Sequence, residues 1–472
     1  MSCTGVPSRP SLLALVPRAG VICVSVLVVL PASHALAYWR LTPQVEAGIT
    51  YQTNPRYLTS EQEAANPDGG DDVLGTYIDV LTEGVWKTPS TTVSLEPRLR
   101  RTDYLKANDD LNNDDTFVNF LAAHTGSRGS VALSVGYQDT LIVTSDFQSG
   151  LPDSPGAPPP VNGTTGRYSN ATQKTWSYQP SLTFQVSTRN ALSIRGQLSD
   201  TTYNEDNLRT AVTPLYVDYS NLSVELAIRH YLNPKSSFVL ALNGGNFQTD
   251  NQGSRIQNSN LGSRIQNFTD SFGITAAYDY IFSATLTGSV TAGTTRSAVD
   301  ISGITTGLDF LTGFPCSAER TCSISNEARN FVGYAQLRKR SEDTTFNFSL
   351  SQAIAPNSNG TQTVQKSVRM DVDQTLTRKL SSGIGAIYSK NSSLTKDSSP
   401  LGQFGDFRQD SSYLTVDSRI SWNLTETLSV YGSYSYISGE TDTNNSNFSS
   451  NSKQSNNRVF LGVRYRGVGF QR

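Results

Sequence analysis

Cysteine, histidine and charged residues are all scarce in this chain of 472 residues, which has four cysteines, three histidines and 17% charged residues. Two of the cysteines and one histidine lie within the first 37 residues. Of the rest, Cys316 and Cys322 have no histidine nearby to complete a zinc site, and neither His124 nor His230 lies in a nucleophile motif. We therefore expect no catalytic residue, no metal and no cofactor, and an enzyme is the least favoured class of function.

Long apolar runs are absent after the N-terminal region. Two arginines precede an apolar run from Ala19 to Leu30, and this region ends in Ala35-Leu36-Ala37. This layout is typical of a cleavable secretory signal, and the run is too short to span a bilayer as a helix. We predict that residues 1–37 are a signal peptide and that residues 38–472 are exported. If the exported chain lies in a membrane, a closed barrel must satisfy its backbone polar groups.

A concentrated basic face is also missing, since the formal net charge is −2, and this argues against a nucleic-acid partner. In an exported protein, two cysteines separated by five residues favour a disulfide that closes a loop. We therefore expect Cys316 and Cys322 to form a disulfide.

Alternation of apolar and polar residues is the main pattern that is present. Along Thr175–Val186 the even positions are apolar or aromatic, whereas the odd positions are Thr, Ser or Gln. The same alternation occurs in Val93–Leu99, Val131–Tyr137, Leu222–Ile228 and Leu414–Trp422. Successive side chains of a strand point to opposite faces, so the pattern predicts strands with one apolar and one polar face.

The connections between these segments alternate in length. Short turns such as Thr188–Asn190 and Leu232–Lys235 alternate with long polar loops such as Thr140–Gln173, Ser297–Glu327 and Gly439–Asn456. This alternation is typical of outer-membrane barrels, which have short periplasmic turns and longer extracellular loops. The predicted fold class is all-β: a transmembrane antiparallel up-and-down β-barrel of roughly 18 strands, with both termini periplasmic.

Aromatic residues near the predicted strand ends favour a membrane barrel over a soluble sheet. In such barrels they form girdles at the two membrane interfaces. The residues are Tyr51, Tyr77, Trp86, Tyr104, Tyr137, Trp176, Tyr203, Tyr231, Tyr280, Tyr388, Trp422 and Tyr436.

Charged residues of both signs fall on the polar side of the alternation and are predicted to line the lumen. They are Glu96, Arg98, Arg100, Arg195, Glu225, Arg229, Arg369, Asp371, Asp373, Asp417 and Arg419. One interpretation is a charged constriction that selects what passes. The other is that these ions pair across neighbouring strands and only solvate or plug the lumen.

Two acidic runs, Asn66–Asp72 and Asn108–Asp115, fall in predicted loops. Carboxylates and amides at this density suit calcium, but neither run has the spacing or the closing glutamate of an EF-hand. Solvated acidic loops are the favoured interpretation.

Three segments resemble a known family. Trp39–Asn54, Phe346–Gly360 and the closing Phe460–Arg466 are similar to strands of the outer-membrane β-barrel porins that accompany exopolysaccharide operons and exosortase systems. The resemblance implies a Gram-negative outer-membrane barrel that helps to export or assemble a secreted polysaccharide. It implies no catalytic residues.

The leading hypothesis is therefore an outer-membrane channel for polysaccharide export, because a barrel of about 18 strands is wide enough for an aqueous lumen. A general or nutrient-uptake porin is one alternative. A surface-loop adhesin or polymer anchor with a plugged lumen is another. The expected partners are outer-membrane lipid, polysaccharide or small hydrophilic solutes, and periplasmic export components.

Overall fold

The computed structural model describes residues 37–55, 72–105, 112–141, 172–204, 217–249, 263–305, 307–308, 315–316, 321–356, 362–394, 408–445 and 448–471. Residues 1–36 of the predicted signal peptide lie outside this set, as do most of the first acidic run and the first half of the second. The side chains of Cys316 and Cys322, the expected disulfide, are also outside it. Within the described ranges, no helix is long and apolar enough to cross a membrane.

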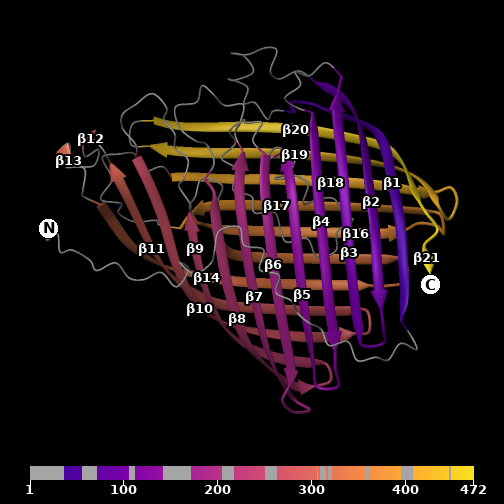
Figure 1. Cartoon of the computed structure of the whole chain (residues 1–472), viewed down its shortest axis with the longest axis horizontal. Helices are drawn as coiled ribbons and strands as arrows, with labels where there is room; N and C mark the ends of the chain where they lie inside the picture. Colours follow the sequence, from indigo (N-terminus) through magenta and orange to yellow (C-terminus); the bar gives the residue numbers. More distant parts are fainter. Residues whose placement is uncertain are drawn as a thin grey trace. The chain divides into compact units, whose positions relative to one another are not determined.

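Eighteen antiparallel strands pair in chain order, and the last pairs with the first, so the sheet closes. They are β1 (Tyr38–Gln52), β2 (Val73–Lys87), β3 (Thr91–Tyr104), β4 (Asn113–Thr125), β5 (Gly129–Leu141), β6 (Thr172–Gln185), β7 (Asn190–Asn204), β8 (Tyr219–Asn233), β9 (Ser236–Thr249), β10 (Ser263–Ser283), β11 (Leu286–Thr305), β14 (Thr321–Arg340), β15 (Thr344–Pro356), β16 (Gln362–Thr375), β17 (Leu380–Ser393), β18 (Arg408–Asn423), β19 (Leu428–Asn445) and β20 (Phe448–Arg466). The remaining segments are β12 (Gly307–Leu308), β13 (Pro315–Cys316) and β21 (Phe470–Gln471). In Figure 1, β1–β8 and β16–β20 form opposite walls of the barrel. The predicted fold class is confirmed.

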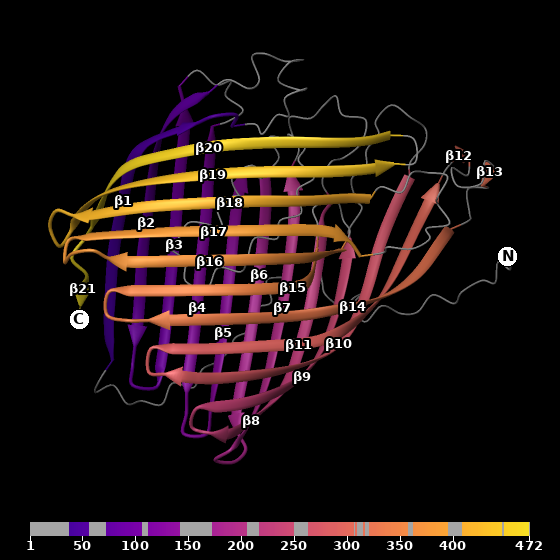
Figure 2. The same ribbon diagram turned by 180° about the vertical axis from the view of Figure 1, so that it is seen from behind.

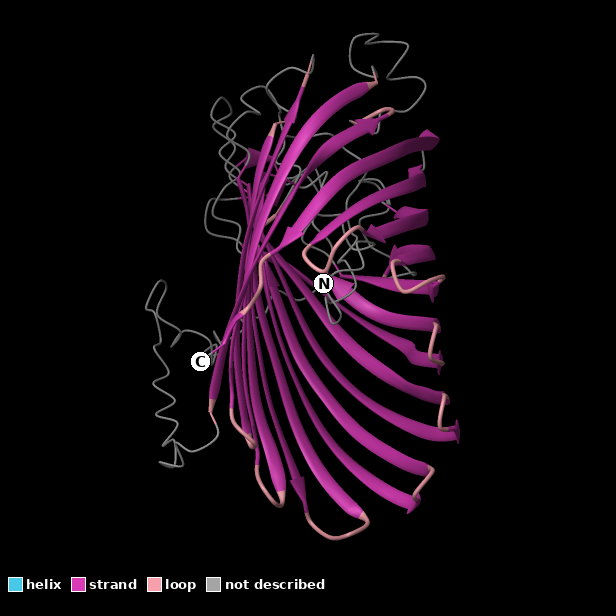
Figure 3. Ribbon diagram, turned by 90° about the vertical axis from the view of Figure 1, so that its right-hand side faces the viewer, coloured by secondary structure: helices cyan, strands magenta, loops and turns pink. Residues whose placement is uncertain are grey.

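Eight short turns of two to four residues join the strands at one end of the barrel, and Figure 3 shows them in pink along one rim. In four of these turns the side chain of a serine or threonine accepts a hydrogen bond from the backbone N three residues ahead. The Oγ1 atom of Thr377 accepts a hydrogen bond from the backbone N of Leu380 at 3.0 Å. The Oγ1 atom of Thr425 accepts the equivalent bond from the backbone N of Leu428 at 2.9 Å. Such side-chain bonds are the local reason that these sequences turn. The first strand begins and the last strand ends at this rim.

At the opposite end, two predicted loops are partly strand. β11 and β14 extend well into Ser297–Glu327, and β19 and β20 pair through most of Gly439–Asn456. The prediction of long loops was wrong there, because serine- and asparagine-rich segments still pair through their backbones when a neighbouring strand continues beside them. Polar composition therefore indicated which segments have solvated side chains, but it did not indicate where the strands end.

The distribution of polarity is the reverse of that in a soluble protein. On the outer face Leu99 is 59% exposed and Val290 is 57% exposed. On the opposite face Asp79 is 2% exposed and Glu46 is 6% exposed. A soluble protein does not expose apolar residues around its whole circumference, so the outer face is built to contact lipid.

The seam between β1 and β20 ends in a β-bulge. The backbone N of Gly467 donates to the carbonyl of Pro43 at 2.8 Å, but Pro43 has no N–H to return the bond. The pairing then shifts by one residue and resumes between Leu41 and Phe470 in β21. The end of the chain therefore lies along β1, as Figure 1 shows.

The ladder between β14 and β15 is the shortest between consecutive barrel strands. Pairing begins where Arg340 lies opposite Thr345 and stops where Gly333 lies opposite Gln352. In contrast, β14 pairs with β11 along its whole length, as far as Thr321. Figure 2 shows β10, β11 and β14 turning away from β15–β20. Beyond the last pair, the side-chain Nε2 of Gln352 donates to the carbonyl of Phe331 at 2.8 Å. A side chain thus replaces backbone pairing where the two strands separate.

Candidate functional site

All of the sequence-predicted charged residues lie on one face of the sheet, opposite the exposed apolar side chains. This follows from the strand registers, because every strand pair keeps the two faces distinct around the closed barrel. The face encloses the lumen. The structure gathers these residues into three separate groups on different strands.

The first group spans the seam from β20 to β3. Asp79 on β2 forms ion pairs with Arg98 at 2.7 Å (Nη2 to Oδ2) and with Arg100 at 2.8 Å (Nε to Oδ2). Next to these pairs, Arg464 on β20 forms an ion pair with Glu46 on β1. The hydroxyl of Tyr431 donates to the second oxygen of Glu46 at 3.0 Å, while the Arg464 guanidinium lies over the Tyr431 ring at 5.2 Å from its centroid. Glu46 therefore has partners for both oxygens.

The second group lies on β16 and β18. Arg369 pairs with Asp371 on the same strand at 2.6 Å (Nε to Oδ2), and Arg419 pairs with Asp373. In the register Asp417 lies opposite Ser435 of β19. The group contains three carboxylates and two guanidiniums, so it is the most acidic part of the predicted set.

The third group is on the far wall. Arg195 pairs with Glu225 at 3.1 Å (Nη1 to Oε1), and Arg229 pairs with Asp279 at 2.7 Å (Nη1 to Oδ2). Ser237 bridges the second pair, because its hydroxyl donates to Asp279 at 3.1 Å and accepts from Arg229 at 2.9 Å. Of the predicted residues, Glu96 and Asp417 make no ion pair within the described part of the chain.

Sequence reasoning missed the partners that complete these groups. Glu46, Asp79, Asp279 and Arg464 all lie on the lumen face and form the ion pairs above. The period-two alternation of β1, β2, β10 and β20 is the signal that identifies this face in each case. Which cation meets which carboxylate depends on register, which one sequence does not supply.

Several aromatic residues expected in the interfacial girdles lie in the lumen instead. Tyr77 is 5% exposed, and its ring covers Gly48 and Gly462, which face each other across the seam. A Cβ added to Gly462 would lie 2.5 Å from the Tyr77 hydroxyl. Tyr104 covers Gly75 in the same way. The girdle prediction was wrong for these tyrosines, because nearness to a strand end does not determine which face a residue takes.

Other aromatics do lie on the outer face near the strand ends. Trp176 and Tyr388 are 43% and 47% exposed at one level, and Trp86 packs beside Trp39 at the other with ring centroids 6.2 Å apart. These positions fit an aromatic girdle at each membrane interface.

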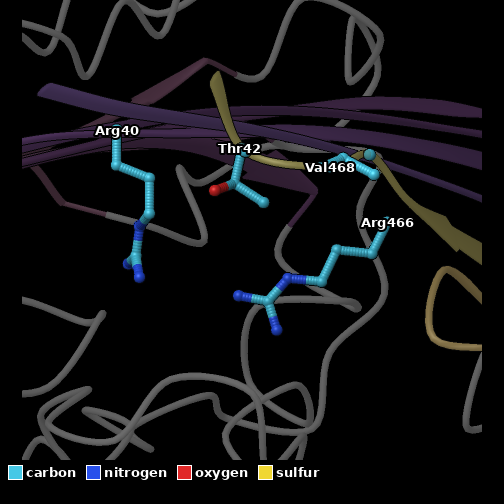
Figure 4. Close-up of a pocket in the computed structure, with 6 residues that line it drawn as sticks. Arg40, Thr42, Arg466 and Val468 are labelled. Atoms are coloured by element: carbon cyan, nitrogen blue, oxygen red, sulfur yellow. The ribbon is translucent and has the colours of Figure 1, made fainter. Parts of the chain in front are cut away.

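Two cavities open on the lumen face. One, of about 440 Å³, is lined by residues of β1–β3 and β14–β20, including Arg98, Arg458 and Phe460. The Arg458 guanidinium stacks over the Phe460 ring at 4.1 Å. The second, of about 370 Å³, lies at the bulge after β20, where Arg40 and Arg466 extend into the same space (Figure 4). Cationic and aromatic groups therefore line the seam side of the lumen.

The two histidines lie beside the short turns, on the outer face of β4 and β8. His124 Nδ1 is 2.9 Å from the hydroxyl of Thr91, and His230 Nδ1 is 2.8 Å from the side-chain oxygen of Asn190. Neither contacts a carboxylate within the described residues. Among the described residues, no three histidine, cysteine, aspartate or glutamate side chains lie close enough together to hold a metal ion.

Comparison with known proteins gives similarity of fold only. No family model and no curated protein matches the sequence. Similar solved structures include the ferric-catecholate import receptor Fiu from E. coli K12, which is 9% identical with a TM-score of 0.42 over 90% of this chain and 81% of that one. The siderophore receptor PirA from Pseudomonas aeruginosa is 9% identical with a TM-score of 0.38, over 90% and 80% of the two chains. A loop-deletion mutant of OmpT from Vibrio cholerae is 11% identical with a TM-score of 0.33, over 92% and 100%.

The chain forms an outer-membrane β-barrel. The conclusion rests on the closed 18-strand sheet, the exposed apolar outer face and the polar lumen face. Lipid contacts the outer face, and the charged and aromatic lumen is the candidate functional site.

Proposed function

We propose that the barrel is a channel through which a hydrated, neutral or weakly charged polysaccharide crosses the outer membrane during export. The observation that carries the proposal is the pairing of the lumen charges. Arg98, Arg195, Arg229, Arg369 and Arg419 each contact a carboxylate. Paired charges leave a weak net field, which disfavours strong ion selectivity and suits a solute recognised by hydrogen bonds.

An uncharged wall supports the same proposal. The lumen positions of β5 and β6 carry only Ser, Thr, Gln, Ala and Gly. They are Ser130, Ala132, Ser134, Gly136, Gln138 and Thr140 on β5, and Gln173, Thr175, Ser177, Gln179, Ser181, Thr183 and Gln185 on β6. Hydroxyls and amides both donate and accept hydrogen bonds, so they exchange contacts with sugar hydroxyls as a chain slides past.

Aromatic rings in the lumen supply a second kind of contact. Tyr431 and Phe460 line the larger cavity on the seam side, and on the far wall Tyr203 lies 6.4 Å from Tyr219 by ring centroids. Flat apolar ring faces bordered by polar tips match the mixed faces of a pyranose ring. Weak contacts repeated along both walls favour passage over tight binding.

The deciding experiment is conductance of the refolded chain 38–472 in a planar bilayer, with neutral linear glucans of increasing length added to one side. We expect an ohmic current of weak ion selectivity that the longer glucans interrupt in a voltage-independent way. A silent folded barrel, or a current that long glucans never alter, contradicts the proposal.

A matched pair of variants tests the uncharged wall. Gln179→Leu removes an amide from the lumen face of β6, and we expect it to shorten the glucan interruptions while leaving salt conductance unchanged. Thr172→Leu makes a comparable polar-to-apolar change on the outward side of the same strand, away from the lumen, and is expected to alter neither property. Release of preloaded polymer from vesicles then separates export from uptake of small solutes, because a general porin passes only the short glucans.

A further inference from the structure

Two lysines lie side by side on the outer face of the barrel. Lys366 on β16 and Lys390 on β17 are directly opposite in the register, and both are exposed. Figure 2 shows the two strands as neighbours in the wall. Directly opposed residues of an antiparallel pair have Cβ atoms about 5 Å apart, and like charges at that separation destabilise the sheet.

The neighbouring outward residues on each strand indicate the depth of the two lysines relative to the membrane. On β17 the outward residue before Lys390 is Tyr388, 47% exposed, and on β16 the outward residues after Lys366 are Val368 and Met370, 41% and 44% exposed. An exposed tyrosine above apolar residues marks the membrane interface. The lysines are thus the first charged row beyond the apolar belt, at the end away from the short turns, which is the extracellular side.

The surrounding groups do not neutralise the pair. In the register Gln352 flanks Lys366 and Ser412 flanks Lys390, and both are uncharged. Asp410 lies one row nearer the end of β18, yet neither lysine forms an ion pair with it or with any other described carboxylate. Two positive charges therefore share one site without a protein counter-ion among the described residues.

Other outward lysines at the same end are neutralised. Lys174 pairs with Asp139 at 3.4 Å, and Lys453 pairs with Glu440 at 3.5 Å (each Nζ to a carboxylate oxygen). The contrast shows that the barrel can supply a carboxylate to a rim lysine and does not do so at Lys366 and Lys390.

We infer that Lys366 and Lys390 bind the phosphate of a phosphate-bearing lipid headgroup in the outer leaflet. A phosphate group provides up to two negative charges and several acceptor oxygens, so one group satisfies both ammonium groups. Lipid phosphates are confined to the level at which these side chains lie, and confinement raises their local concentration. The apolar surface of Val368 and Met370 continues below the site along the path of the acyl chains.

The test is native mass spectrometry of the refolded chain 38–472 in detergent micelles, titrated with diphosphorylated lipid A. The expected result is saturable binding that weakens about fivefold for each charge removed in Lys366→Gln and Lys390→Gln. Lys390→Arg keeps the charge and is expected to retain binding. Lys453→Gln removes a lysine already paired with Glu440 and is expected to bind like the parent.

Three results would overturn the inference. They are equal binding of lipid A from which the phosphates have been removed, an equal loss in Lys453→Gln, and full competition by inorganic phosphate at the lipid's own concentration. The last result would indicate a site for free phosphate. Folding is monitored by the heat-dependent mobility shift of the barrel, and both glutamine variants should fold because each relieves a like-charge contact.

Discussion

Arg419 on β18 reaches Asp373 on β16 across the intervening strand, because the residue between them is Gly383. A Cβ at Gly383 would lie 2.5 Å from the Asp373 Oδ1 atom and 2.6 Å from the Arg419 Nε atom. The glycine thus makes room for an ion pair between strands that do not touch.

Gly383→Ala is expected to break this ion pair and to lower the free energy of unfolding by about 1–3 kcal/mol, the usual cost of inserting a methyl group into filled space. Denaturant unfolding in detergent micelles, followed by tryptophan fluorescence, measures the change. Gly244→Ala is the control, since a Cβ there has no neighbour within 4 Å. Equal stability of the two variants would show that the Gly383 site relaxes freely.

Tyr77 provides a test of packing in the lumen. Its ring covers Gly48 and Gly462, and its hydroxyl has no hydrogen-bond partner among the described residues. Tyr77→Ala is expected to destabilise the barrel by about 3 kcal/mol, because it leaves a cavity beside two glycines. Tyr77→Phe is expected to be neutral or slightly stabilising, since it removes a buried unsatisfied hydroxyl. A large loss in Tyr77→Phe would reveal a partner for the hydroxyl.

Asp79 controls the charge balance of the seam group. Asp79→Asn removes the carboxylate that Arg98 and Arg100 both contact, so we expect the reversal potential in a salt gradient to shift toward anion selectivity. Arg98→Ala is expected to shift it in the opposite direction. Glu327→Gln makes the same charge change as Asp79→Asn on the outer face, where Glu327 pairs with Arg296, and should leave selectivity unchanged.

Arg369→Ala extends the selectivity test to the more acidic group on β16 and β18. Because Asp371, Asp373 and Asp417 remain there, the variant should become more cation-selective than the parent. The measurement is again the reversal potential of single channels. An unchanged value in both Arg98→Ala and Arg369→Ala would mean that these charges are remote from the ion path.

The short ladder between β14 and β15 predicts the least protected part of the barrel wall. Amides of Ala328–Val332 and Ala353–Ala355 should exchange with deuterium sooner than those of Ser438–Asn445, which pair with β20. Exchange is measured by mass spectrometry of peptides from the folded barrel. Gln352→Ala removes the side-chain bond to Phe331 and should accelerate exchange in the first segment only.

The sequence by itself determined the barrel and the two faces of its wall. Alternation along Thr175–Val186 and similar segments is a local property, because a strand exposes alternate side chains to opposite faces whatever its partners are. Turn residues such as Thr377 and Thr425 are likewise local, since each bonds to a backbone N–H three residues ahead. The strand number and the lumen face of Arg98 and Arg369 follow from such signals.

Only the tertiary structure decided which residues meet. The partnership of Arg229 with Asp279 joins positions 50 residues apart, and the pairing of Arg464 with Glu46 depends on how the last strand closes on the first. The ring of Tyr77 packs against the lumen wall because two glycines on other strands leave space for it. These relations arise from strand register and the shear of the closed sheet, and a shift of one residue would exchange the faces of a whole strand.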